Sequence, residues 1–339
     1  MQKQVKTAAV ILLAAIAILA VLAGLTNALP ALEKARPAFF ALSALFFLAS
    51  IFLWLLPWSL LIGGRKTGLC ETTLIGFSCV FAALTPVQVG ADALRSVKMK
   101  EASNLPYSDS ISASMAIKGI KFLFISVLAA LSFSVTFFNP ILGLWVKAAL
   151  LSGFAVIVIA VLLFLLPLRK GVGEKIASLF AFLSRFFSPF QKLSSYFQKY
   201  GSFLQNISMG KIALVSLLAL ASLLFELVAF FYAFLSVEIA APFYSVLAIF
   251  SILIILERTP FLPRGIGVVE LAAFILLSSE GFAGLALNSG EIAAVIILFD
   301  VVRLIIPTAL SLALYFALSS KKRLAKAKLR ENKNPENAV

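Results

Sequence analysis

Long uninterrupted apolar runs dominate the hydrophobic pattern of this chain. About 20 apolar residues are enough for a helix to cross the roughly 30 Å hydrocarbon core of a bilayer. Six runs reach that length, at 7–29, 37–62, 117–138, 148–168, 212–236 and 291–317, and three shorter ones lie at 72–84, 243–256 and 267–279. The pattern predicts an all-α polytopic integral membrane protein.

Two of the shorter runs adjoin similar motifs that contain proline and glycine. Residues 85–90 read TPVQVG and residues 262–267 read LPRGIG, so both contain Pro-x-x-[Val/Ile]-Gly. Each motif lies about 50 residues after the start of a long run, and matched interruptions of this kind are typical of inverted repeats in transporters. We therefore predict two inverted-topology repeats with Pro/Gly-interrupted re-entrant half-helices. Two chance Pro/Gly loops between ordinary helices are the alternative. The motif residues are Pro86, Gly90, Pro263, Gly265 and Gly267.

Basic residues outnumber acidic ones by 29 to 15, which gives a formal net charge of +14. On a soluble protein this excess indicates nucleic-acid binding, but here the basic residues lie beside the apolar runs. With a cytoplasmic N terminus and short runs that enter and return, 23 basic residues fall on the cytoplasmic side and 3 fall outside. The cytoplasmic set includes the run from Arg95 to Lys121. This asymmetry predicts a multi-pass plasma-membrane protein with both termini in the cytoplasm.

The same pattern divides the chain into four parts. Residues 1–168 form the first membrane repeat and residues 212–318 the second, and residues 319–339 form a basic cytoplasmic tail. In residues 169–211 apolar side chains recur at three- and four-residue steps between basic residues, which is typical of helices that lie in the membrane interface. A plain linker is the alternative for this segment. An uncleaved first helix is expected at the N terminus, with a cleavable signal peptide as the alternative.

The residue types that are absent exclude several chemistries. The chain has no histidine, which excludes histidine-based triads and histidine-rich zinc sites. Only Cys70 and Cys79 remain as soft ligands, at a spacing unlike a CxxC pair. No Walker-type phosphate loop occurs. We expect no metal and no cofactor, and two thiols packed against lipid or against other helices.

Ionisable residues inside apolar runs are costly and indicate function by default. Asp300 and Arg303 lie three residues apart and can neutralise one another on one helix face. Glu226 lies mid-run, where it is either protonated or paired with Arg303, Arg264 or Arg258. Glu270 follows Gly267 by three residues, where it either caps a half-helix or faces a head group or a cation.

Several of these residues form a candidate substrate site. Guanidinium groups suit phosphate because they donate two parallel hydrogen bonds and stay charged when desolvated. A phosphate-headed amphiphile therefore fits a basic lining around the two interrupted segments. The candidate substrate-binding residues are Arg95, Glu226, Arg258, Arg264, Glu270 and Arg303.

These motifs also carry a family resemblance. The segment 261–277 (FLPRGIGVVELAAFILL), followed by the Asp300–Leu304 stretch and Pro307, resembles the lysylphosphatidylglycerol synthetase transmembrane, or flippase-like, family. Residues 85–95 resemble the family's earlier P-x-x-x-G-E-x-x-R element. Arg264 replaces a usual glycine, and Asp92 lies two residues after Gly90 where the family has an acid directly after glycine. The resemblance implies a translocase that moves aminoacylated phospholipids or isoprenoid-linked sugars between leaflets.

Three functions remain open at this point. The first is a lipid or glycolipid translocase without enzymatic activity, whose partners are anionic phospholipids or isoprenoid-linked lipids. The second is a membrane-embedded transferase in lipid or polyprenyl-linked glycan synthesis, although the outer loops offer no paired carboxylates for a metal–phosphate substrate. The third is an accessory subunit of a synthase complex. A homodimer or a separate synthase partner is compatible with the first, and no nucleic-acid partner is expected.

Overall fold

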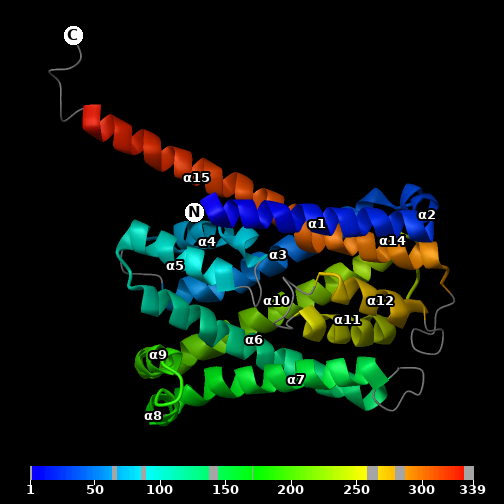
Figure 1. Ribbon diagram of the computed structural model, residues 1–339. Coiled ribbons are helices and arrows are strands. Elements are labelled where there is room, and N and C mark those ends of the chain that lie inside the picture. The colour runs from blue at the N-terminus through cyan, green and yellow to red at the C-terminus, as the bar shows by residue number, and fades with distance from the viewer. Residues whose placement is uncertain are drawn as a thin grey trace.

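The computed structural model describes residues 2–62, 67–84, 89–136, 144–169, 171–257, 266–278 and 287–331. Within them the chain is almost entirely helical and contains no strand. The helices are α1 (Gln2–Thr26), α2 (Leu29–Glu33), α3 (Pro37–Ile62), α4 (Leu69–Phe77), α5 (Val89–Ser103), α6 (Tyr107–Thr136), α7 (Leu144–Leu165), α8 (Val172–Leu183), α9 (Pro189–Gln205), α10 (Met209–Ser236), α11 (Phe243–Glu257), α12 (Val268–Ser278), α14 (Ser289–Asp300) and α15 (Ile306–Glu331). Figure 1 shows the long helices packed side by side as a bundle.

Six helical stretches are long and apolar enough to cross a membrane, and they confirm the six predicted runs. They are Ala9–Thr26, Pro37–Ile62, Tyr107–Leu131, Leu151–Leu168, Met209–Ser236 and Ser289–Ser320. The largest difference is the third, which begins ten residues before the predicted 117. Residues 107–116 (YSDSISASMA) are rich in serine, so their hydropathy is low although they continue the helix. This extension places Lys118 and Lys121 well inside the helix and not in its first turns.

The shorter apolar runs are short helices packed inside the bundle. Residues 72–84 divide into α4 and the 3-10 turn Val80–Ala83 (η1), and the other two runs are α11 and α12. From Ile249 to Leu256 every residue of α11 is buried, which explains why its sequence is apolar without being long enough to span. The inverted relation between the two halves stays a prediction, because residues 85–88 and 258–265 lie outside the described residues.

The core is built around α3 and α10, which pack along one another. Ser43 is fully buried and donates a hydrogen bond to the carbonyl of Ala229, 2.7 Å away. Small polar residues of this kind let two helices in a membrane approach closely. Phe46 packs against Phe225 and Tyr232 at ring-centroid distances of 5.3 and 5.5 Å. Helices α3 and α10 together form one side of the cavity described below.

Helices α8 and α9 form a hairpin at one end of the bundle. In Figure 1 both are seen nearly end-on beside the end of α7, whereas α6 and α7 run across the picture, so the hairpin lies across the direction of the spans. A Cβ added to Gly173 on α8 would meet the Cα of Gly201 on α9 at 3.0 Å. Glycine is therefore required at this crossing, where the two backbones touch.

The positions of the chain ends support a test of the predicted orientation. The N terminus, the later part of α15 and the α8–α9 hairpin all lie at the same end of the bundle (Figure 1).

In a Cys70→Ser background, a cysteine at exposed Ser320 or Ser195 is expected to react with membrane-impermeant reagents only after the cells are opened. A cysteine at Lys34, exposed near α2 at the other end, is the control and should react in intact cells. Labelling of Ser320→Cys or Ser195→Cys from outside would contradict the cytoplasmic orientation.

Candidate functional site

A cavity of about 270 Å³ lies within the bundle. Its walls come from α3, η1, α5, α6, α7, α10 and α11 and are mainly apolar, with Phe47, Trp54, Phe122 and Phe164 among the larger side chains. Six charged side chains also line it, and they are Asp92, Arg95, Lys118, Lys121, Glu226 and Glu257. A few convergent polar groups in an apolar pocket are typical of a ligand site.

The first charged group in the cavity centres on Asp92, in the first turn of α5. Asp92 is buried and forms ion pairs with Arg95, one turn further on, and with Lys118 of α6. Burial alone would raise the pKa of Asp92, but the charges of Lys118 and Arg95 lower it below the ordinary carboxyl value. The guanidinium of Arg95 also lies 5.4 Å from the ring centroid of Trp58, over its face. Asp92 therefore stays charged beside two cations.

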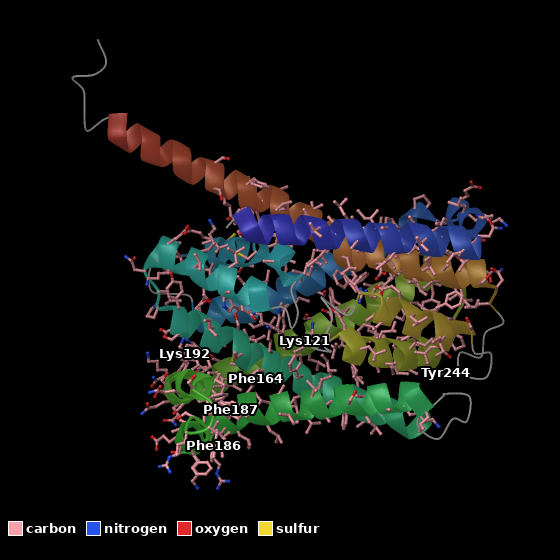
Figure 2. All side chains as sticks on the ribbon, viewed as in Figure 1. Lys121, Phe164, Phe186, Phe187, Lys192 and Tyr244 are labelled. Atoms are coloured by element: carbon pink, nitrogen blue, oxygen red, sulfur yellow. The ribbon has the colours of Figure 1, made fainter. Side chains whose placement is uncertain are left out.

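The second charged group joins α6 to α10. Lys121 Nζ lies 2.6 Å from Glu226 Oε1, and only 4% of the lysine side chain is exposed. The ammonium group also lies 4.9 Å from the ring centroid of Trp54. Figure 2 shows Lys121 in the interior of the bundle. Because Lys118 and Lys121 are three residues apart, both face the cavity from one side of α6.

The third charged group surrounds Arg303. Its guanidinium lies 2.6 Å from Asp300 Oδ1 and 2.9 Å from Glu270 Oε1, and all three residues are buried. Glu270 also accepts a hydrogen bond from the backbone N–H of Gly267, whose φ of +91° favours glycine. Arg303 lies in a π-helical turn, Val301–Ile305 (η5). Pro307 has no N–H to donate to the carbonyl four residues earlier, which accounts for the widened turn.

A small chamber lies between the second and third groups. It has a volume of about 20 Å³, and its lining includes Glu226, Glu257 and Arg303. Glu226 and Glu257 also line the larger cavity, so the two spaces share walls. Its three charged side chains offer polar partners, and the volume is large enough for one water molecule. The two spaces therefore bring one member of the third group, Arg303, close to the walls that Glu226 and Glu257 share.

The candidate residues from the sequence are placed unequally. Arg95 and Glu226 line the cavity, whereas Arg303 lines the small chamber. Glu270 accepts the capping hydrogen bond at the start of α12, as one of the two interpretations expected, and its other carboxylate oxygen pairs with Arg303. Gly90 lies in the first turn of α5 rather than in a loop. Pro86, Arg258, Pro263, Arg264 and Gly265 lie outside the described residues.

Two interpretations of the charges need correction. Arg95 and Lys121 are 5% and 3% exposed inside the bundle, and Lys118 lies beside them, so these three do not belong to a basic cytoplasmic run. The partner of Glu226 is Lys121, whereas the sequence offered only arginines or a proton. The reason is the same in both cases. The predicted third span began at residue 117, so Lys118 and Lys121 lay in its first turns and were counted as charges at its cytoplasmic end, whereas the helix begins at Tyr107.

Sequence reasoning also missed four cavity residues. Asp92, Lys118, Lys121 and Glu257 all line the cavity. One signal was available, because Lys118 and Lys121 are three residues apart at the start of an apolar run and therefore share a helix face. The serine-rich stretch before them, extended as helix, places both away from the end of the span. No comparable local signal identifies Glu257, whose position depends on how α11 packs in the bundle.

Comparison with known proteins identifies the family of this membrane-spanning chain. Residues 7–311 match the family model described as the lysylphosphatidylglycerol synthase TM region. The chain belongs to this family. It is also 22% identical over 269 residues to a UPF0104 membrane protein from Methanothermobacter thermautotrophicus, over 73% of this chain and 76% of that protein. The family match includes every residue of the three charged groups.

Proposed function

We propose that this member of the family moves a phosphate-headed or aminoacylated lipid between the leaflets of the plasma membrane without changing it chemically. The observation that carries the proposal is the cavity inside the membrane-spanning bundle, with its apolar walls and converging charges. Lipid tails fit apolar walls, whereas a head group needs polar partners to replace the water that it loses.

The charges in the cavity match the groups of such a lipid. Arg95, Lys118 and Lys121 can bind a phosphate through charge-assisted hydrogen bonds. Glu226 and Glu257 can bind the ammonium group of an aminoacyl ester. The cations are already paired with Asp92 and Glu226, so an incoming phosphate exchanges one anionic partner for another. Such an exchange keeps the cations neutralised whether the site is loaded or empty.

The test is leaflet exchange in liposomes that contain the purified protein. Fluorescent phosphatidylglycerol and its aminoacylated form are added, and the fraction exposed outside is followed by chemical bleaching. Exchange faster than in protein-free liposomes is expected, with the lipid mass unchanged. Replacing Lys118 with glutamine should slow exchange by about tenfold or more, because a charge-assisted hydrogen bond contributes about 1.5–3 kcal/mol.

Lys100→Gln is the matched control, because Lys100 is exposed at the surface of α5. This variant should exchange lipid at the rate of the unmodified protein. Exchange no faster than in empty liposomes would contradict the translocase proposal. A change in the mass of the lipid would instead identify a transferase.

A further inference from the structure

The α8–α9 hairpin presents an apolar surface that the rest of the bundle leaves uncovered. Leu179, Phe182, Phe186 and Phe187 are 56%, 53%, 67% and 64% exposed. Phe186 and Phe187 lie in the turn between the two helices, at the outer corner of the bundle (Figure 2). Four exposed aromatic and aliphatic side chains on one short hairpin are unfavourable in water, so this surface has a partner.

The charges of the hairpin identify the chemistry of that partner. Residues 169–211 contain seven basic residues and one acidic residue. Lys175, Arg185, Lys192 and Lys199 are all exposed. A surface that is both apolar and basic complements anionic phospholipid, since acyl chains accept the phenylalanines and head groups attract the cations. The hairpin also lies across the spans, which is the orientation of a helix resting in a membrane surface (Figure 1).

The hairpin is connected to the wall of the cavity. The Tyr200 hydroxyl on α9 donates a hydrogen bond to the Phe164 carbonyl on α7, 2.7 Å away. The side chain of Phe164 lines the cavity. Met115 of α6 also lines it and packs against the buried cluster of Phe197 and Tyr200. A displacement of α9 therefore moves two side chains of the cavity wall.

We propose that the α8–α9 hairpin docks on an anionic lipid surface and that docking positions the Phe164 wall of the cavity. The phenylalanines of the turn enter the headgroup boundary, and the basic side chains contact lipid phosphates. The docking step stands on the hairpin alone. The effect on the cavity rests on the proposed lipid translocation, and the two are tested by separate measurements.

The docking test measures how deeply the hairpin turn enters the membrane. A cysteine replaces Phe186 in a Cys70→Ser/Cys79→Ala background, is labelled with an environment-sensitive fluorophore, and the protein is reconstituted with lipids brominated in the acyl chains. Quenching is expected to rise when phosphatidylglycerol is added to phosphatidylcholine. Each basic side chain neutralised, as in Arg185→Gln or Lys192→Gln, should lower the ratio of docked to free hairpin by about fivefold.

Two controls make this result specific. Ser195 shares the α9 face of Lys192 and Lys199 and is exposed, so a fluorophore at Ser195→Cys should be quenched less than one at Phe186→Cys. Lys34→Gln removes an exposed charge at the opposite end and should leave the quenching at position 186 unchanged. Equal quenching at positions 186 and 195, or quenching that does not respond to phosphatidylglycerol, would overturn the docking.

The coupling test measures leaflet exchange in the same vesicles. Tyr200→Phe removes the hydroxyl that donates to Phe164, so it should keep the quenching at position 186 while making exchange insensitive to phosphatidylglycerol content. Exchange by Tyr200→Phe that follows phosphatidylglycerol as in the unmodified protein would overturn the coupling. If no variant exchanges lipid while the quenching result holds, the translocase proposal fails and the docking stands.

Discussion

Replacement of Lys121 with methionine is expected to lower the free energy of unfolding by about 3–5 kcal/mol. Lys121 pairs with Glu226 at 2.6 Å, and the glutamate side chain is only 14% exposed. Removing the ammonium group leaves a carboxylate inside the bundle without its partner, which is the costly way to break a buried ion pair. Thermal unfolding in detergent measures the effect, with the buried thiol of Cys79 as the reporter in a Cys70→Ser background.

The double variant Lys121→Met/Glu226→Leu separates the structural role of this pair from its role in transport. Because both charges are removed together, stability should return close to that of the unmodified protein. Leaflet exchange should still fall by about tenfold or more, since the cavity then has one cation fewer for phosphate and one carboxylate fewer for ammonium. A double variant as unstable as Lys121→Met would contradict the pairing, and a stable double variant with normal exchange would contradict the role in transport.

The spans could be predicted from the sequence because hydrophobicity is a local property. A continuous apolar run reports directly on the solvent that surrounds a helix, and all six predicted runs are membrane-length helices. Residues 107–116 show the limit of this reasoning. Their serines face the inside of the bundle, where Ser110, Ser112 and Ser114 are buried, so low hydropathy there marks packing and not the end of a span. Only tertiary contact distinguishes these two cases.

The site could be predicted in part, for a related reason. Charged residues in apolar runs are visible in the sequence, so the sequence alone identifies Glu226, Glu270 and Arg303 as candidates. Their partners depend on contacts between helices that are distant in the chain. Lys121 and Glu226 are 105 residues apart, and neither carries a local signal for the other. Glu270 was the easiest to interpret, because its spacing from Gly267 is a local helix-capping pattern that the fold retains.

The environment of Arg303 changes what its guanidinium is expected to do. The sequence pointed to a phosphate clamp, with pairing to Asp300 as the simpler alternative. In the fold Arg303 contacts Asp300 and also Glu270, from a different helix. Asp300 Oδ2 is buried and has no hydrogen-bond partner among the described residues. Arg303 therefore holds α12 against the π-helical turn, and it lines the small chamber together with Glu226 and Glu257.

Replacement of Arg303 with methionine is therefore expected to be among the most damaging single changes, with a loss of about 3–5 kcal/mol or more in the free energy of unfolding. It leaves two buried carboxylates, Asp300 and Glu270, without their shared cation. Arg303→Lys should recover part of this loss and not all of it, because one ammonium cannot reproduce the planar fork that contacts both carboxylates. Thermal unfolding in detergent, with Cys79 as the reporter, ranks these variants.

The matched control is Arg36→Met, which breaks an ion pair with Glu238 of similar length, 2.7 Å, between side chains that are 59% and 51% exposed. An exposed pair contributes about 0–1 kcal/mol, so this change should be nearly silent. The triple variant Arg303→Met/Glu270→Gln/Asp300→Asn removes all three charges and should regain much of the stability that Arg303→Met loses. If Arg303→Met were no worse than Arg36→Met, the carboxylates would not depend on Arg303, and the phosphate clamp would return as the better account of its guanidinium.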